Sequence, residues 1–379
     1  MEASLRKKNV NSLMPVADKE KHDSKSEPSL LTRLLTNIFL GANLFALVLL
    51  WTSCATTWLN PSLFPRMTIL GLAFPLFLLP NLLFIPLWLL LRPRMVLVPL
   101  LGIGLCGSYI FDYVPLRLSS SSQPEGMKVL SWNAYAPSDL QADTVSQYLL
   151  QSEADIICLQ EFAPTRKSYQ PLLTEMTARG YQQESDGNGR YVFSRYPILD
   201  MHVLDMATAH TNGVMALQLL VDADTVCLLN CHFESISFSD DDKGDLNSTI
   251  HDPDRSKVHS ELRFLARKLA SPAAFRGRQV ECVGHYLDSL PSQRSVLLCG
   301  DFNDTPISYT YQHISRRLQS SFRQAGRGVG VTYAERNFPI RIDHIFSSSH
   351  WQCTRAEVQQ QVLLSDHYPV VAYLKKSTQ

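Results

Sequence analysis

The segment VLLCGDFND, from Val296 to Asp304, carries the clearest signal of a fold in this chain. A short apolar run that ends in a turn is typical of a buried β-strand. Asp301 and Asn303 come directly after that run. Since a sheet presents functional groups at the carboxyl ends of its strands, this segment predicts a buried strand with candidate catalytic residues at its end.

The same arrangement recurs on both sides of this segment. KVLSWN, DIICLQE and TVCLLNCHF are apolar runs with polar residues at or near their ends, and IDHIFSS and VVAYL are later strand-like runs preceded by polar residues. The polar residues at these positions are Asn133, Glu161, His232, Asp343, Asp366 and His367. We therefore expect carboxylates, amides and histidines to converge on one crevice.

Strand-like runs alternate with helical stretches from Lys128 onward, which predicts an α/β fold. We expect helices near Asp143 to Gln151 and at Arg255 to Leu269. Val214 to Val221 and Thr225 to Phe233 are separated only by a short turn, which predicts an antiparallel hairpin. The sheet is therefore expected to be mixed or antiparallel and not a simple Rossmann sheet.

The composition differs sharply between the two ends of the 379-residue chain. Between Leu34 and Leu91 the only charged residue is Arg66, whereas the part from Gly126 onward has 24 Lys and Arg against 28 Asp and Glu, a formal net charge of −4. The average composition, with 45% hydrophobic residues and equal numbers of basic and acidic residues, excludes three classes of protein. These are a disordered chain, a disulfide-stapled miniprotein and a strongly basic nucleic-acid binder. The chain combines a lipid-like region with one large soluble domain.

Three uncharged apolar runs predict a membrane anchor of about three transmembrane helices within residues 30–113. Leu34 to Trp51 is the first span and Met67 to Leu91, which contains three prolines, is the second. Met95 to Phe111 is shorter, and it is either a third span or a re-entrant segment. The anchor makes this an integral membrane protein, of an inner or plasma membrane, that contacts membrane lipids through its N-terminal helices.

Lys and Arg side chains set the expected orientation of these spans. They are more frequent before the first span and between the second and third spans than on the opposite side. The positive-inside rule therefore places the N-terminus inside and the large domain outside the cytoplasm. With only two spans the domain would face the cytoplasm instead.

The remaining parts of the chain carry little predicted chemistry. Residues 1–29 have the composition of a disordered polar tail, and residues 114–126 have that of a linker to a domain at 127–379. The cysteines of that domain form no CxxC pair, so we expect buried small side chains and no structural zinc. Ser239 to Asp245 is acidic but lacks the spacing of a calcium loop, which favours a solvated loop.

Hard oxygen ligands are what Mg²⁺ prefers, and a phosphate ester needs its charge neutralised while water attacks. Carboxylates can bind the metal or orient water, and a histidine can donate to a phosphate oxygen or a leaving group. The predicted cluster therefore suits metal-dependent hydrolysis of a phosphate ester.

Six motifs appear in order as LSWN, DIICLQE, NCHFES, GDFND, RIDHIF and LSDHYPV. Together they resemble the metal-dependent endonuclease/exonuclease/phosphatase superfamily, which includes deoxyribonuclease I, apurinic endonucleases, neutral sphingomyelinases and inositol-polyphosphate phosphatases. The resemblance covers Met127 to Leu374. It implies an α/β fold of the deoxyribonuclease I type, a two-sheet β-sandwich flanked by helices, here preceded by transmembrane helices.

The resemblance also implies roles for individual residues. It makes Glu161 a metal ligand, places Asn133 beside the metal and carries the aspartate of the SDH motif over to Asp366 as a further metal residue. The implied metal is Mg²⁺, with Mn²⁺ as a substitute. Asp301 and Asn303 would orient the attacking water and contact the phosphate.

Two histidines complete the implied site. His367 resembles the phosphate-contacting histidine and Asp343 the carboxylate that orients it. His232 matches the histidine of the N-x-H motif, where apurinic endonucleases usually have a tyrosine, so the chain departs from that branch. Structural roles are the alternatives for Asn133 and Asp343 as caps and for His232 as a core histidine.

The sequence leaves the substrate open. A domain charge of −4 argues against tight, sequence-independent duplex binding, although a local basic patch can offset it. The expected partner is a phosphate ester, either a nucleic acid or a lipid headgroup, and no obligate protein partner is evident. A binding module that keeps the fold without catalysis is the alternative from another class.

Overall fold

Apolar helices form in the N-terminal part of the chain, as its composition predicts. The computed structural model describes residues 29–116, 124–206, 208, 212–236, 255–334 and 339–377, and the chain divides into two compact units, residues 1–42 and 43–379. Helix α1 (Leu30–Ala55) begins in the first unit. Residues 1–28 of the predicted tail, most of the predicted linker and the acidic stretch Ser239 to Asp245 lie outside the described residues.

Two of the predicted spans form helices that are long and apolar enough to cross a membrane, Leu30–Trp58 and Phe74–Leu91. The third is broken, because Pro93–Gly104 and Gly107–Tyr113 are bent by 64°. The helical elements from Thr56 onward are η1 (Thr56–Trp58), η2 (Pro65–Met67), α2 (Thr68–Leu72), α3 (Phe74–Leu91), η3 (Pro93–Val96), α4 (Leu97–Gly104) and α5 (Gly107–Tyr113).

Helices α1 and α3 share a buried polar contact. The Nδ2 of Asn43 donates to Oδ1 of Asn81 at 3.3 Å, and Nε1 of Trp88 donates to Oδ1 of Asn43 at 3.0 Å. Asn43, Asn81 and Trp88 are all fully buried. Such interhelical hydrogen bonds hold membrane helices together where hydrophobic burial gives no driving force.

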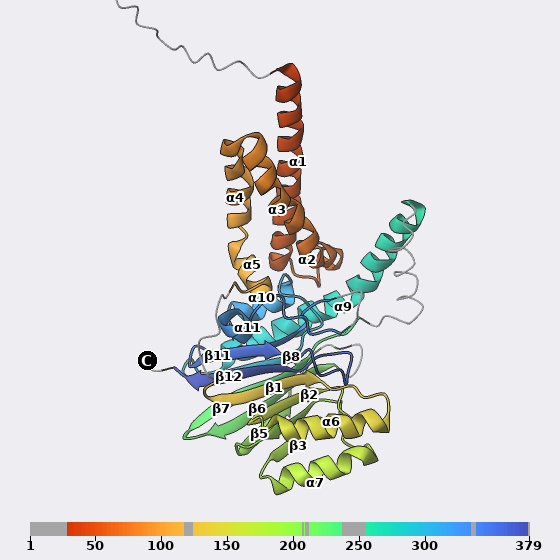
Figure 1. Ribbon diagram of the computed structural model, residues 1–379. Helices are drawn as coiled ribbons and strands as arrows, with labels where there is room; N and C mark the ends of the chain where they lie inside the picture. The colour runs from red at the N-terminus through yellow and green to blue at the C-terminus, as the bar shows by residue number, and fades with distance from the viewer. Residues whose placement is uncertain are drawn as a thin grey trace, which may run out of the picture. The chain divides into compact units, whose positions relative to one another are not determined.

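Within the described residues from 124 onward, the strands form two six-stranded sheets that pack face to face (Figure 1). The first has the order β11-β12-β1-β2-β4-β3 and the second β5-β6-β7-β8-β10-β9. Their strands are β1 (Met127–Asn133), β2 (Ile156–Gln160), β3 (Gln182–Ser185), β4 (Tyr191–Ser194), β5 (Ile198–Val203), β6 (Gly213–Val221), β7 (Asp224–His232), β8 (Ser295–Asp301), β9 (Gln319–Ser320), β10 (Asp343–Ser347), β11 (Trp351–Val358) and β12 (Val370–Lys376).

Both sheets are mixed. Strands β1 and β2 are parallel, as are β7 and β8, while β6 and β7 form the predicted antiparallel hairpin. The core between the sheets consists of apolar side chains such as Val129 and Ile156 from the first sheet and Leu217 and Leu228 from the second. The prediction of a mixed two-sheet α/β sandwich is confirmed.

Helices cover the outer face of each sheet (Figure 1). The first sheet is covered by helices α6 (Asp139–Ser152) and α7 (Gln170–Ala178). The short helix η4 (Lys167–Tyr169) directly precedes α7. Helices α9 (Arg255–Ser289) and α10 (Tyr309–Ser315) pack on the second, and α11 (Ser321–Ala325) lies beside β11.

Two helices are longer than their predicted ranges. Helix α6 starts at Asp139 because the hydroxyl of Ser138 caps it by accepting a hydrogen bond from the Gln141 amide. Helix α9 continues through Pro272 to Ser289. The burial of Val280 and Val283 against the second sheet stabilises this extension, which local sequence signals alone did not predict.

The prediction that most cysteine side chains are buried agrees with the structure. All eight cysteines are free, and each is buried except Cys282, which is half-buried. They behave as small apolar side chains.

Candidate active site

Predicted site residues from both sheets meet where the central strands end. Strand β7 ends at His232, which pairs with Asp301 at the end of the parallel strand β8. Asp301 also pairs with Asp343 at the start of the antiparallel strand β10. In the other sheet β1 ends at Asn133, and Glu161 directly follows β2. The register of the strands therefore places these side chains at one edge of the sandwich.

Unusual backbone conformations occur at two of these positions. Glu161 has a φ of 52° and Asn303 a φ of 50°, in the left-handed region that non-glycine residues seldom adopt. Gly300, with a φ of 139°, precedes Asp301, and a Cβ there would lie 1.9 Å from the carbonyl oxygen of Cys231. The glycine of the GDFN motif thus permits β7 and β8 to approach closely.

The carboxylate of Asp301 is the centre of the site. Its Oδ2 accepts hydrogen bonds from Nδ2 of Asn133 and Nδ2 of Asn303, each at 3.2 Å, and its Oδ1 accepts the Asn303 amide at 2.8 Å. Asn133 also donates to Oε1 of Glu161 at 2.9 Å. Asn133 therefore links the carboxylates of the two sheets, and Asn303 holds the Asp301 carboxylate in place.

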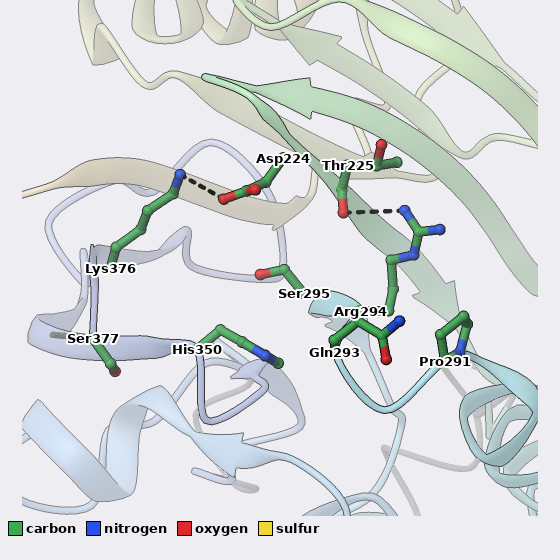
Figure 2. Close-up of a pocket in the computed structure, with 9 residues that line it drawn as sticks. All are labelled: Asp224, Thr225, Pro291, Gln293, Arg294, Ser295, His350, Lys376 and Ser377. Atoms are coloured by element: carbon green, nitrogen blue, oxygen red, sulfur yellow. Dashed lines mark hydrogen bonds and ion pairs between the residues drawn. The ribbon is translucent and has the colours of Figure 1, made fainter. Parts of the chain in front are cut away.

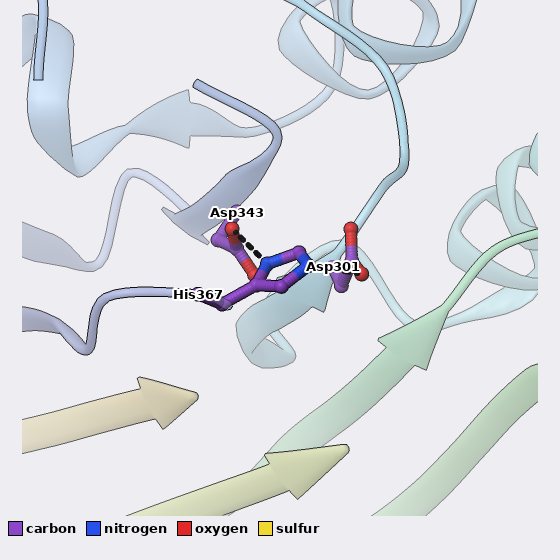
Figure 3. Close-up of side chains that lie close together, drawn as sticks. All are labelled: Asp301, Asp343 and His367. Atoms are coloured by element: carbon purple, nitrogen blue, oxygen red, sulfur yellow. Dashed lines mark hydrogen bonds and ion pairs between the residues drawn. The ribbon is translucent and has the colours of Figure 1, made fainter. Parts of the chain in front are cut away.

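The two predicted histidines lie on either side of Asp301. Nδ1 of His367 is 2.9 Å from Oδ2 of Asp343, and its Nε2 is 3.8 Å from Oδ2 of Asp301 (Figure 3). Nε2 of His232 is 3.6 Å from Oε1 of Glu161 and 3.8 Å from Oδ2 of Asp301. Seven of the eight predicted site residues are thus joined in one network.

Burial and neighbouring charges perturb the pKa values in this network. Burial, together with the nearby Asp343, raises the pKa of Asp301 to about 7. Burial opposes the charged form of His367, but the Asp343 and Asp301 carboxylates outweigh it and raise the pKa of His367 to about 10. Burial, with the charges of Arg190 and His367, lowers the pKa of His232 to about 3. The site therefore holds one charged and one neutral histidine at neutral pH.

A family model described as the endonuclease/exonuclease/phosphatase family matches residues 130–367, which is more than half of the chain. The chain belongs to this family. A second model, described only as a domain of unknown function, matches residues 36–113. No curated protein matches the chain.

Several solved structures are similar to part of this chain. They include the human Nocturnin catalytic domain with bound sulfate, which is 17% identical, covers 66% of this chain and 94% of its own length, and has a TM-score of 0.47. An endonuclease/exonuclease/phosphatase from Beutenbergia cavernae is 18% identical, with coverages of 66% and 72% and a TM-score of 0.46. Truncated Caenorhabditis elegans TDP2 is 15% identical, with coverages of 66% and 98% and a TM-score of 0.44. These similarities carry no argument about substrate.

Members of this family are typically hydrolases of phosphoester bonds that depend on a divalent metal. The donor set here fits such an ion. Oδ1 of Asn133 is buried without a hydrogen-bond partner, while the neighbouring Glu161 carboxylate is 39% exposed. Unpaired hard oxygen atoms beside an open carboxylate are the ligands that Mg²⁺ and Mn²⁺ accept.

A second group of potential ligand atoms comes from Asp301, Asp343 and His367, which lie within 4.8 Å of one another (Figure 3). His367 is hydrogen-bonded to Asp343 through Nδ1, and its raised pKa keeps its ring protonated. A protonated imidazole cannot ligate a metal.

Asp366 is the predicted site residue that the network does not include. Its carboxylate is exposed and accepts a hydrogen bond from the Ser365 hydroxyl at 3.2 Å, and its carbonyl accepts the Ala334 amide. Its negative charge still contributes to the raised pKa of His367. The metal-ligand role of Asp366 stays a prediction.

Sequence reasoning missed several residues that support the site. The side chain of Gln160 donates to Oδ1 of Asn230 at 2.7 Å, which is a buried polar contact between the two sheets. Thr332 accepts the Asp343 amide through its hydroxyl oxygen. Asn230 lies in the NCHFES motif and Gln160 in the DIICLQE motif, but no local pattern indicates their contact across the two sheets or the role of Thr332.

A separate pocket lies at the opposite end of the central strands and is distinct from the family site. Its cavity has a volume of about 520 Å³ and is lined by nine residues (Figure 2): Asp224, Thr225, Pro291, Gln293, Arg294, Ser295, His350, Lys376 and Ser377. Ser295 begins β8, whereas Asp301 ends it, a separation of about 20 Å. Lys376 is paired with Asp224 at 2.9 Å, and Arg294 donates to the Thr225 carbonyl at 3.3 Å.

Proposed function

We propose that this protein is a membrane-anchored, Mg²⁺-dependent phosphoesterase that hydrolyses a phosphodiester or phosphomonoester bond by direct attack of water. The observation that carries this proposal is the convergence of seven predicted residues around Asp301, with the unpaired Oδ1 of Asn133 beside the open carboxylate of Glu161. Mn²⁺ is expected to replace Mg²⁺ because both accept oxygen ligands.

Glu161 and Asn133 would hold the metal, with Asp366 as the third predicted ligand. When bound, the ion supplies a positive charge that polarises the phosphoryl oxygen and offsets the charge that develops during attack. Asn133 also donates to both Glu161 and Asp301. Its role is to hold the metal-binding carboxylate of Glu161 at a fixed position relative to the Asp301 carboxylate.

Asp301 would accept the proton of the attacking water, and Asn303 would hold Asp301 in place. A pKa of about 7 suits a general base at neutral pH. The water oxygen forms a bond to phosphorus, its proton passes to Asp301, and the P–O bond to the leaving group breaks. Asn303 supports this arrangement by donating its amide and side chain to the two oxygens of Asp301.

His367 and His232 would act on the phosphate from different strands. The charged His367, held by Asp343, would donate to a phosphoryl oxygen and stabilise its negative charge. His232 would polarise the phosphate or assist the leaving group. Its lowered pKa favours a neutral hydrogen-bond donor.

The location of the site is part of the proposal. Asn60, between the first two apolar helices, donates to Glu281 of α9 at 2.5 Å, and Asp112, at the end of the third segment, accepts from Gln312 of α10 at 2.8 Å. Asn60 and Asp112 both contact helices that cover the second sheet, so both lie on the same side of the membrane as the catalytic domain. The chain between them must therefore cross the membrane an even number of times. Helix α3 supplies one crossing, and the bent segment of α4 and α5 would supply the other.

This count supports three crossings. Together with the Lys and Arg side chains before the first span, it supports a topology with the N-terminus inside and the catalytic domain outside the cytoplasm. The substrate would then be a nucleic acid outside the cell or a lipid headgroup at the outer face of the membrane. The formal charge of −4 from Gly126 onward favours the lipid headgroup over tight duplex binding.

The test is an assay of the full-length protein, purified in detergent micelles, against DNA, RNA, phospholipid, sphingomyelin and inositol phosphates. Each substrate is incubated with Mg²⁺, with Mn²⁺ and with a chelator. We expect hydrolysis of at least one class that the chelator abolishes. Turnover of none of them with either metal would contradict the proposal, and binding without turnover would identify a binding module of the same fold.

A further inference from the structure

The loop that carries Asp301 and Asn303 continues into a contact with the membrane helices. Ile307, four residues after Asn303, is 1% exposed and belongs to a buried apolar cluster. The other buried members of that cluster are Leu50, Cys54, Phe74 and Cys106, which come from α1, from α3 and from the break between α4 and α5. Four residues span at most ~14 Å, so the catalytic loop is held close to these helices.

Gly71 of α2 lies directly against the same loop. A Cβ built on Gly71 would be 2.4 Å from the carbonyl oxygen of Ile307, closer than real side-chain contacts allow. Gly71 is buried in the helix, and the carbonyl that faces it belongs to backbone. A side chain at Gly71 would therefore displace the backbone of the catalytic loop.

A second contact joins the membrane helices to the RIDH motif. The guanidinium of Arg341, which is 3% exposed, donates through Nη2 to the carbonyl oxygen of Asp112 in α5. The Asp112 carboxylate is 1% exposed and accepts from Arg323 at 2.7 Å and from Gln312 at 2.8 Å. Arg341 also lies over the Phe322 ring, 4.1 Å from its centroid. Asp112 thus links α5 to three side chains of the catalytic domain.

These two contacts reach the same part of the site. The amide of Phe302 donates to the carbonyl of Ile342 at 2.8 Å, and Asp301 pairs with Asp343 across β8 and β10. Gln312, which donates to Asp112, also donates to the carbonyl of Pro306 at 3.0 Å. The GDFN loop and the RIDH strand are therefore held to each other and to the membrane helices.

We propose that the membrane segment, residues 43–113, positions the active site as well as anchoring it. The Gly71–Ile307 contact fixes the position of the GDFN loop, and the Asp112–Arg341 contact fixes the position of the RIDH strand. Residues 43–379 form one compact unit, which agrees with a single catalytic body that includes both parts. The catalytic consequence rests on the proposed function, whereas the positioning itself does not.

Gly71→Ala and Gly104→Ala form a matched pair of test variants. Both place one methyl group on a helical glycine of the membrane segment, but a Cβ at Gly104 would meet nothing within 4 Å. In full-length protein in micelles, with a small soluble phosphodiester as substrate, we expect kcat to fall about 10- to 100-fold in Gly71→Ala. We expect KM within twofold of wild type, because the substrate-binding groups remain, and wild-type kinetics in Gly104→Ala.

Amide hydrogen exchange of the peptide from Phe302 to Ile307 gives a readout that needs no turnover. We expect faster exchange in Gly71→Ala than in wild type and no change in Gly104→Ala. If the wild-type protein hydrolyses nothing but its exchange pattern follows this expectation, the proposed function fails and the positioning stands. Unchanged exchange in Gly71→Ala, or equal acceleration in both variants, overturns the positioning.

A second pair guards against a simple failure of Gly71→Ala to fold. Ile307→Ala removes the side chain from the helix cluster, and Ile307→Val keeps most of it. We expect Ile307→Ala to accelerate exchange in the catalytic loop and lower kcat, while Ile307→Val restores both toward wild type. Equal behaviour of the two variants would overturn the role of Ile307.

Discussion

The imidazole of His367 donates through Nδ1 to the Asp343 carboxylate at 2.9 Å, and both side chains are buried at the edge of the sandwich. His367 lies in the loop before β12, and Asp343 begins β10, so the pair joins the two sheets across the site. Because this bond fixes the orientation of the ring and stabilises its positive charge, the Nε2 of His367 is left to face Asp301 at 3.8 Å.

The pair is expected to act as one unit. His367→Ala and Asp343→Asn should each lower kcat by about 10²- to 10⁴-fold, since either change removes the oriented imidazolium. The double variant should lose little more than the worse single variant. Steady-state rates of the three variants decide this, and strictly additive losses would contradict the proposed pair.

His232 is expected to act separately, because it lies on β7 and its Nε2 faces Glu161 and Asp301. If it assists the leaving group, His232→Ala should lose about 10²-fold or more on a substrate with a poor leaving group and much less on one with a good leaving group. Rates on the two substrates are compared with those of Asp343→Asn. Equal losses at His232 on both substrates would remove the leaving-group role and leave a phosphate contact or a core residue.

Metal dependence is expected to require Glu161. Glu161→Gln keeps the size of the side chain and a hydrogen-bond acceptor for Asn133, but it removes the charge that holds the ion. The variant should lose most of the activity, and the concentration of Mg²⁺ needed for the half-maximal rate should rise. The melting temperature without metal, measured as a control, should stay near that of wild type. Activity that survives both this substitution and a chelator would show that the metal assignment is wrong.

The catalytic domain is expected to lie outside the cytoplasm. Reporter fusions at Gly126 and at the C-terminus should both report an exterior location, and a fusion between Arg92 and Arg94 should report the cytoplasm. Three crossings require this alternation. Cytoplasmic signals from Gly126 and from the C-terminus would mean that the bent segment of α4 and α5 does not cross.

Acid is expected to destabilise the domain partly through His344. This buried histidine donates to the Asp304 carbonyl, and burial, with the nearby Arg341 charge, lowers its pKa to about 3. The unfolded histidine takes up a proton below about pH 6.5, whereas the folded one does not. The contribution of His344 to the free energy of unfolding is therefore fully present above that pH and falls by about 1.4 kcal/mol for each pH unit below it.

Melting temperatures in micelles between pH 7.5 and pH 5 test this expectation. Wild type should lose stability over that range, and His344→Gln, which keeps a donor but does not titrate, should start lower and lose less. Parallel curves for the two proteins would assign the acid sensitivity to other groups.

Local sequence patterns predicted the elements whose burial is visible along a single stretch of chain. The apolar runs before Asn133, Glu161 and Asp301 predicted the strands, and polar residues at their ends predicted the site. The short turn between Val221 and Asp224 predicted the hairpin. These features depend on hydrophobic periodicity and turn composition, and both patterns are visible within a short stretch of sequence.

By itself, then, the sequence determined the family, the two-sheet fold, the apolar helices and the identity of the candidate site residues. Only the tertiary structure decided that Asp301 is the centre of the site, that α9 continues past Pro272, and that Asp112 binds Arg341. Asp112 and Arg341 are 229 residues apart, and the sequence around neither residue indicates the other as its partner. Their contact exists because whole elements pack on one another, and the energy of such packing is not expressed in any local pattern.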